Sequence, residues 1–192
     1  MNKHTELKKE EWKDIIADQR TGDRKNYVAA PSAGPGILAK YEELLDKAIG
    51  KKTEFTALVL GATPELRDMV LERGGQLTTL DISQDMIKKT TPLMKHQNHT
   101  NETIIEGSWL ESGFKDNSFN IILGDGISAN IAFQDQDQLF SQLKRLLNSD
   151  GFLILREVGL SKDRKQQTVE EIEQEYLDGK IHWFDVFFTL YF

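Results

Sequence analysis

The sequence predicts an α/β fold, a three-layer α-β-α sandwich built around a mostly parallel sheet. Short apolar runs alternate along the chain with segments whose apolar residues recur at helical spacing. The runs ALVL, NIIL and FLIL are continuous rather than alternating, which is typical of strands covered by helices on both faces. With 192 residues and 39% hydrophobic content, the chain can bury one sizeable core, so we expect no second full domain.

The first part of the chain is expected to precede the sheet. Residues 5–19 predict a polar helix, and the turn-rich segment TGDRKNYVAAPSAGPG after it predicts a flexible connection or lid. We therefore expect an N-terminal helix and lid over residues 1–36, followed by the main domain over 37–192. That domain opens with a helix over 37–49, which Gly50 ends.

Strands and helices then alternate with short connections. Pro64 suits the first turn of a helix, where its missing N–H has no partner to lose, and Ser83 is an N-cap for the helix that follows. The expected strands cover residues 56–61, 77–81, 102–106, 119–124 and 152–157, and the expected helices cover residues 64–73, 83–95, 136–147 and 168–177. This order predicts a parallel sheet.

Charge and composition exclude several classes of function. A net charge of −7 and a pI near 5.2 argue against a surface for DNA or RNA, which needs clustered lysine and arginine. The chain has no cysteine, which excludes disulfides and thiolate zinc sites, and no metal-ligand spacing links its histidines. The N-terminus lacks an apolar signal core and no stretch is long enough to span a bilayer, so we expect a cytoplasmic protein without membrane contact.

The most informative stretch contains Gly61 and Asp81. They stand 20 positions apart, the separation that places a tight turn under a nucleoside and a carboxylate beside its ribose. The turn lacks the G-x-G-x-x-G pattern of dinucleotide sites, because it reads Gly61-Ala62-Thr63-Pro64-Glu65. Pro64 removes a backbone donor and Glu65 adds negative charge, so the turn disfavours a diphosphate and favours a ligand with a cationic centre.

This pattern resembles class I S-adenosylmethionine-dependent methyltransferases, over roughly residues 35–160. The resemblance implies a Rossmann-like methyltransferase fold with S-adenosylmethionine as cofactor. It implies these cofactor contacts: the turn of Gly61, Ala62 and Thr63 under the methionine part, Glu65 near its cationic end, Asp81 on the ribose hydroxyls and Ile82 against the adenine. Ser108 stands where the family often has an aspartate for the adenine, so that contact rests on backbone groups and the Trp109 ring.

Asp125 follows the stretch Asp116–Gly124, which resembles the family's D-x-S-F-D motif leading into the fourth strand. It is expected at the carboxyl end of that strand, facing both cofactor and acceptor. It is the candidate general base if the acceptor is a hydroxyl or a protonated amine, although methyl transfer does not require a base.

Each of these residues also has a structural interpretation. Gly61 can simply end a strand, Asp81 can cap the next helix, and Asp125 can serve a turn. We expect a methyltransferase acting on a small-molecule acceptor. The alternatives are a non-catalytic module that binds S-adenosylmethionine and, less favoured, a dehydrogenase-like nucleotide enzyme.

The C-terminal part is truncated or atypical compared with the family, which continues through another helix and an antiparallel pair of strands. This chain offers one polar helix and then the segment IHWFDVFFTLYF. A large exposed aromatic patch is unusual on a monomer. We therefore expect these side chains to cover the sheet edge or to be buried in the interface of a homodimer. Tyr27 in the predicted lid either closes over the site or is an exposed loop aromatic.

Overall fold

The computed structural model describes residues 35–157 and 168–179. These residues fall into two compact units divided after Glu157, and each unit is described by itself. The predicted helix over 5–19, Tyr27 and the aromatic segment 181–192 lie outside the described residues, so the division at residue 36, the lid and the homodimer stay predictions.

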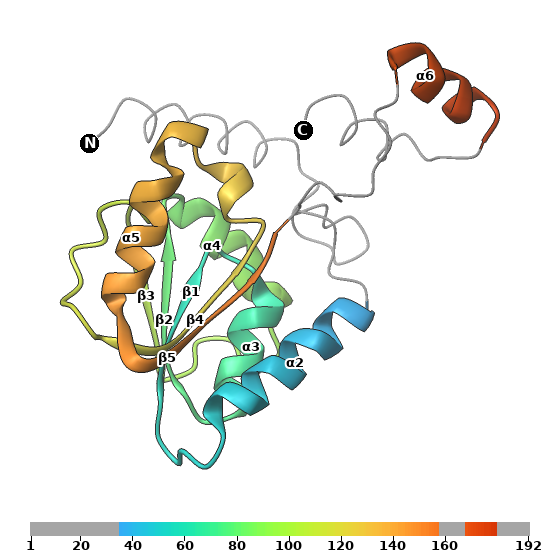
Figure 1. Ribbon diagram of the computed structural model, residues 1–192. Coiled ribbons are helices and arrows are strands. Elements are labelled where there is room, and N and C mark those ends of the chain that lie inside the picture. Colours follow the sequence, from blue (N-terminus) through green and yellow to red (C-terminus); the bar gives the residue numbers. More distant parts are fainter. Residues whose placement is uncertain (1–34, 158–167, 180–192) are drawn as a thin grey trace. The chain divides into compact units, whose positions relative to one another are not determined.

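The first unit is built on a sheet of five parallel strands in the order β3-β2-β1-β4-β5 (Figure 1). The strands are β1 (Thr56–Leu60), β2 (Gln76–Asp81), β3 (Glu102–Glu106), β4 (Phe119–Asp125) and β5 (Leu147–Arg156). Because β1 is the central strand, the carboxyl ends of β2 and β4 lie on either side of the carboxyl end of β1. The predicted parallel sheet is confirmed, and its switch in strand order lies between β1 and β4.

Helices cover the two faces of this sheet, with α2 and α3 on one side and α5 on the other (Figure 1). The α-helices of the unit are α2 (Pro35–Ile49), α3 (Pro64–Glu72), α4 (Gln84–Thr90) and α5 (Gln136–Leu146). Tyr41 and Leu45 of α2 pack with Val59 of β1, while Leu139 of α5 packs with Leu58 on the opposite face. Alternate residues of β1 thus enter two separate cores, which is why the strand reads as a continuous apolar run.

Two boundaries differ by more than two residues from those predicted. The helix α4 ends at Thr90 and is followed by a 3-10 turn over Thr91–Leu93, where Pro92 lacks the N–H that an α-helix needs. The strand β5 begins at Leu147, where the sequence predicted the end of a helix. The pairing between β4 and β5 is irregular, because the register shifts between Phe119 and Ile121.

The second unit contains α6 (Val169–Leu177), which confirms the predicted helix over 168–177. Thr168 and Glu171 form a reciprocal cap: the Glu171 N–H donates to Thr168 Oγ1 at 3.3 Å, and the Thr168 N–H donates to Glu171 Oε2 at 2.8 Å. In the part of the chain that the structure describes, no helix has the length and apolar character to cross a membrane.

Candidate functional site

The turn after β1 brings three of the predicted site residues together. Gly61 has φ of +92°, a conformation that side-chain-bearing residues rarely adopt, and its N–H donates to the Leu80 carbonyl at 2.9 Å. A Cβ at Gly61 would lie 3.7 Å from Cζ2 of Trp109 and 3.8 Å from Oδ2 of Asp81. The backbone at Gly61 therefore faces a carboxylate and an aromatic ring, both close enough to contact a Cβ placed there.

Asp81 ends β2 as a buried carboxylate, with only 9% of the residue exposed. Its Oδ1 accepts the N–H of Ser83 at 2.7 Å, and the Ala62 N–H also bonds to the carboxylate. Burial raises the pKa of Asp81 to about 6, against the lowering effect of these two N–H groups. Among the described residues, the groups that shift this pKa include no lysine or arginine. Such a carboxylate is suited to accept hydrogen bonds from hydroxyl groups.

The helix-capping alternative for Asp81 does not hold in its simple form. The N-cap of α4 is Ser83, whose Oγ accepts the Met86 N–H at 3.2 Å. Asp81 Oδ1 instead accepts the backbone N–H of Ser83, two residues further along the chain, and this bond fixes the turn between β2 and α4. Ile82 lies between them and is half-buried.

Trp109 is held against the end of β2. Its indole Nε1–H donates to the Leu80 carbonyl at 2.9 Å, the same oxygen that accepts the Gly61 N–H. Ser108 is used locally, because its Oγ accepts the Leu110 N–H at 3.2 Å. The ring of Trp109 is thus fixed beside Gly61, while Ser108 shapes the turn that presents it.

Thr63 and Glu65 flank the start of α3. Thr63 occupies the N-cap position without a capping bond from its side chain, and Pro64 follows at the first helical position as predicted. Glu65 lies in the first turn of the helix and is partly exposed. Both residues follow the Gly61 turn directly.

At the end of β4, the Asp125 carboxylate is held by an arginine. Nε of Arg156 donates to Oδ1 of Asp125, and Nη2 donates to Oδ2 at 2.7 Å. The Asp125 side chain is 6% exposed and that of Arg156 is 24% exposed. Hydrogen bonding to Asp125 raises the pKa of Arg156 above its ordinary value. This two-pronged ion pair links the ends of β4 and β5.

Tyr41 of α2 joins the same cluster from the helical layer. Its hydroxyl donates to the Gly124 carbonyl at 2.6 Å and accepts the Arg156 backbone N–H at 3.0 Å. The hydroxyl also lies 3.4 Å from Oδ1 of Asp125. Burial, followed by the charge of Asp125, raises the pKa of Tyr41. A single side chain of α2 therefore ties the ends of two strands together.

Sequence reasoning missed Tyr41 and Arg156 as members of the site. The helical spacing of apolar residues over 37–49 accounts for the buried ring of Tyr41 but not for the bonds of its hydroxyl. Arg156 had a usable signal, because it is a charged residue at the carboxyl end of a predicted strand, as Asp81 and Asp125 are. No group of three or more histidine, aspartate or glutamate side chains is placed to hold a metal ion within residues 35–157 and 168–179.

These features define a class I methyltransferase fold, and comparison with known proteins identifies the family. A family model described as "Methyltransferase domain" matches residues 62–186, more than half of the chain. The chain belongs to this methyltransferase domain family. Because S-adenosylmethionine is the methyl donor of class I methyltransferases, the predicted family and cofactor are confirmed at this level. Comparison with curated proteins gave no significant match.

Solved structures with the same fold include the following three. The YcgJ protein from Bacillus subtilis has a TM-score of 0.54 at 20% identity, over 65% of this chain and 53% of its own. The PH0226 protein from Pyrococcus horikoshii has a TM-score of 0.54 at 22% identity, over 70% and 66% of the two chains. Phosphoethanolamine N-methyltransferase 1 of Haemonchus contortus, solved with phosphoethanolamine and S-adenosylhomocysteine, has a TM-score of 0.60 at 14% identity, over 88% and 37%.

These likenesses confirm the predicted Rossmann-like methyltransferase fold. The chain spans about half the length of the first of these proteins, so their whole activities do not transfer to it.

Proposed function

We propose that this protein is an S-adenosylmethionine-dependent methyltransferase that acts on a small-molecule acceptor. The observation that carries the proposal is the buried Asp81 carboxylate beside Gly61, which backbone N–H groups hold and which no cation among the described residues pairs. A carboxylate with this donor set fits the two hydroxyls of a ribose. The turn beside it fits a nucleoside without a diphosphate, because Pro64 and Glu65 follow where phosphates would need donors.

The cofactor roles are assigned residue by residue. The turn of Gly61, Ala62 and Thr63 lies under the methionine part of S-adenosylmethionine, and Glu65 contributes negative charge near its cationic end. Asp81 binds the ribose hydroxyls. Ile82 and the fixed ring of Trp109 contact the adenine, and Ser108 shapes the turn whose backbone groups face it. When bound, the cofactor supplies an electrophilic methyl group, so the protein acts mainly by alignment and exclusion of water.

Asp125 is assigned a place between cofactor and acceptor, at the end of β4. Its geometry favours a positioning role over proton abstraction, since Arg156 holds both carboxylate oxygens. A base in that position would first have to give up part of a buried ion pair, which is unfavourable. An acceptor that loses its proton to water needs no such base.

The small-molecule class of acceptor is supported by two observations. The net charge of −7 is unfavourable for nucleic acids. A structure with the same fold, phosphoethanolamine N-methyltransferase 2 from Haemonchus contortus, was solved with phosphomonomethylethanolamine and S-adenosylhomocysteine.

Calorimetry tests the cofactor assignment. Titration of the chain with S-adenosylmethionine and with S-adenosylhomocysteine should release or absorb heat, whereas NADH should not. Binding of NADH alone would overturn the proposal. Formation of S-adenosylhomocysteine that depends on an added small-molecule extract would then distinguish an enzyme from a module that only binds the cofactor.

A further inference from the structure

The two edges of the five-stranded sheet differ in length and in apolar character. β3, at one edge, has five residues and ends at the exposed Glu106. β5, at the other edge, has ten residues and contains the apolar run FLIL over residues 152–155. A short edge strand with a charged side chain resists pairing with another chain, whereas a long apolar edge strand favours it. In the described part of the chain, no strand lies on the outer side of β5, so this edge is the one suited to a partner strand.

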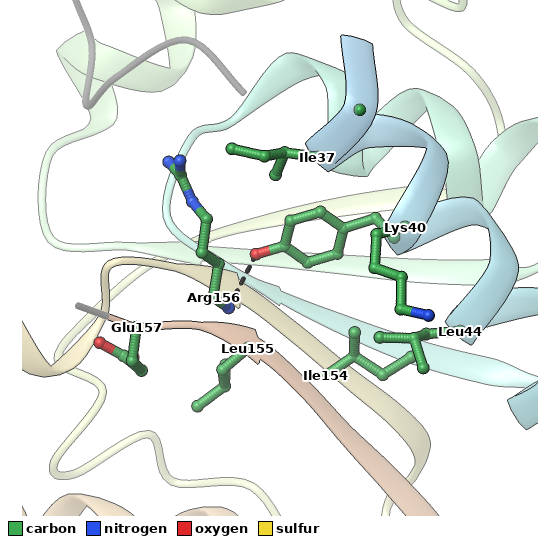
Figure 2. Close-up of a pocket in the computed structure, with 9 residues that line it drawn as sticks. Ile37, Lys40, Leu44, Ile154, Leu155, Arg156 and Glu157 are labelled. Carbon is green, nitrogen blue, oxygen red and sulfur yellow. Dashed lines mark hydrogen bonds between the residues drawn. The ribbon is translucent and has the colours of Figure 1, made fainter. Parts of the chain in front are cut away.

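The exposed apolar side chains of β5 lie on both faces of the sheet. Ile154 packs in the core under α2 (Figure 2), and Leu155 packs against the core under α5. Side chains alternate along a strand, so Phe152 lies on the α2 face and Leu153 lies on the α5 face. Phe152 is 49% exposed and Leu153 is 38% exposed. Among the described residues, neither helical layer covers the outer side of β5 at this point.

The backbone bonds of Arg156 show which amide groups of β5 point to the open edge. Its carbonyl accepts the Gly126 N–H at 2.8 Å, and its N–H donates to the Tyr41 hydroxyl at 3.0 Å (Figure 2), so both groups point toward β4. The N–H and C=O groups of one residue lie on the same side of a strand, and successive residues alternate between the two sides. The residues of β5 whose amide groups point away from β4 are therefore Gly151, Leu153 and Leu155.

A second copy of the chain fits this edge in an antiparallel arrangement. If Leu153 lies opposite Leu153 of the second copy, Gly151 of each chain lies opposite Leu155 of the other. All of these residues point their amide groups outward, and in an antiparallel ladder each such pair exchanges two N–H···O bonds. The edge is therefore complementary to itself, which is the condition for a two-fold symmetric dimer.

The side chains suit the same register. On the α2 face, Phe152 of one copy lies opposite Ile154 of the other, so apolar side chains meet across the interface. Asp150 lies opposite Arg156, so no like charges face each other. Each of these two charged groups already has a partner in its own chain, so the affinity comes from the backbone bonds and the apolar contacts. A parallel arrangement in register would instead place Asp150 opposite Asp150, which is unfavourable.

We propose that the outer edge of β5 is a dimer interface, in which it pairs antiparallel with β5 of a second copy of this chain and the two sheets become one. The pairing of one strand segment buries less surface than a standard interface of about 1,600 Å², so we expect a dissociation constant on the order of 10 μM. The inference is independent of the proposed function. It also differs from the homodimer predicted through the aromatic segment 181–192.

A single cysteine tests the register, because the chain has none of its own. The Cα atoms of the two Leu153 residues would lie about 5.5 Å apart, within the range that a disulfide spans. With dissolved oxygen and a copper catalyst, Leu153→Cys should form a disulfide-linked dimer at least about tenfold faster than Ile104→Cys. Ile104 is the matched control, because it is 42% exposed on β3 at the other edge of the sheet. Equal rates would overturn the proposed pairing.

A charge at the same position tests the strength of the interface. Leu153→Lys places two ammonium groups opposite each other and should weaken dimerisation at least about tenfold. Ile104→Lys makes the same change at the other edge and should leave the dissociation constant within about twofold of the wild type. Sedimentation velocity over a series of chain concentrations measures both. A wild-type chain that stays monomeric throughout the series, or a Leu153→Lys variant that dimerises as the wild type does, would contradict the proposal.

Hydrogen exchange of the wild-type chain distinguishes a second copy from another part of the same chain as the partner of β5. The backbone amides of Leu153 and Leu155 should be protected from exchange only when the chain concentration exceeds the dissociation constant of the dimer. Protection that is equal at all concentrations would mean that the same chain covers this edge, and the proposal would be wrong. None of these measurements depends on S-adenosylhomocysteine, so failure of the dimer and failure of the proposed function are distinguishable.

Discussion

Asp81 and Asp125 end the two strands that flank β1, yet their carboxylates have different kinds of partner. Asp81, at the end of β2, is held by the N–H groups of Ser83 and Ala62, and its pKa is raised to about 6 by burial. Asp125, at the end of β4, is held at both oxygens by Arg156. Among the described residues, the same residue type in the same topological position therefore has no partner cation on one side and an arginine partner on the other.

The comparison of Asp81 with Asp125 indicates which carboxylate is left to bind a ligand and which one is paired within the protein. A buried carboxylate without a cation is unfavourable when ionised, and hydroxyl donors from a ligand relieve that cost. This contrast supports the proposal that Asp81 is the aspartate that binds the ligand. The charge of Asp125 is balanced by Arg156, so we expect this half of the site to keep the ends of β4 and β5 in place.

The largest expected effect is that of Asp81→Ala. This variant should bind S-adenosylhomocysteine at least about tenfold more weakly, because two charge-assisted hydrogen bonds to the ribose are lost. Asp125→Asn, the same position on the other side of β1, should lose no more than about threefold. Calorimetry at pH 7.5 measures both. Equal losses would mean that the two aspartates serve one function and that the comparison is mistaken.

The pH dependence of binding should follow Asp81. In the proposed site, ribose hydroxyls donate to the ionised carboxylate of Asp81, so affinity for S-adenosylhomocysteine should rise with pH up to about 6 and level off above it. A group with pKa about 6 is about one tenth ionised at pH 5, which predicts roughly tenfold weaker binding there than at pH 7. Asp81→Asn should bind weakly with no such slope. A slope that persists in this variant would assign the titration to another group.

The same shift has the opposite sign for folding. Because the pKa of Asp81 is raised from 3.8 to about 6, the folded chain holds this proton more tightly than the unfolded chain. The stability that Asp81 contributes is therefore largest below pH 4 and is lost as the pH rises to 6. At neutral pH, where the strongest binding is expected, the ionised group opposes folding, which is in keeping with the ligand-binding role proposed for Asp81.

The sheet was predictable because its strands are continuous apolar runs bounded by turn residues. All five were placed to within two residues, except at the start of β5. There the residues Asn148, Ser149 and Asp150 have the composition of a turn, yet they belong to a strand whose pairing with β4 is irregular. Local composition does not report a register shift, which depends on the partner strand.

The positions of the site residues were predictable, but their partners were not. Tyr41 meets Gly124 across 83 residues and Arg156 across 115 residues of sequence. Asn120, which replaces an aspartate in the family motif, has its Oδ1 bonded to the Thr56 N–H at 2.9 Å, at the start of β1 and away from the site. Such pairings arise only when the strand order is known, so one sequence indicates where a carboxylate lies but not whether an arginine neutralises it.

A smaller effect on binding is expected from Gly61→Ala. An alanine at φ of +92° is strained by about 1 to 2 kcal/mol, and relief of that strain would move the turn beneath the cofactor. We expect roughly threefold to fivefold weaker binding of S-adenosylhomocysteine. Gly74→Ala is the matched control, because Gly74 has φ of +74° with open space around it, away from the site. Both variants should be less stable to urea, and only Gly61→Ala should bind less well.

The smallest effect on cofactor affinity should come from Tyr41→Phe, which alters only the neutralised side of the site. Loss of the hydroxyl leaves the Gly124 carbonyl and the Arg156 N–H short of a partner, so the free energy of unfolding should fall by about 1 to 3 kcal/mol. Thr56→Val removes a hydroxyl that bonds the Ser118 carbonyl at 3.1 Å, at the other end of the sheet, and should cost a similar amount of stability. Both variants should bind S-adenosylhomocysteine within about twofold of the wild type. A loss of cofactor affinity in Tyr41→Phe as large as that in Asp81→Ala would show that α2 acts on the ribose side, and the two halves of the site would then have to be treated as one.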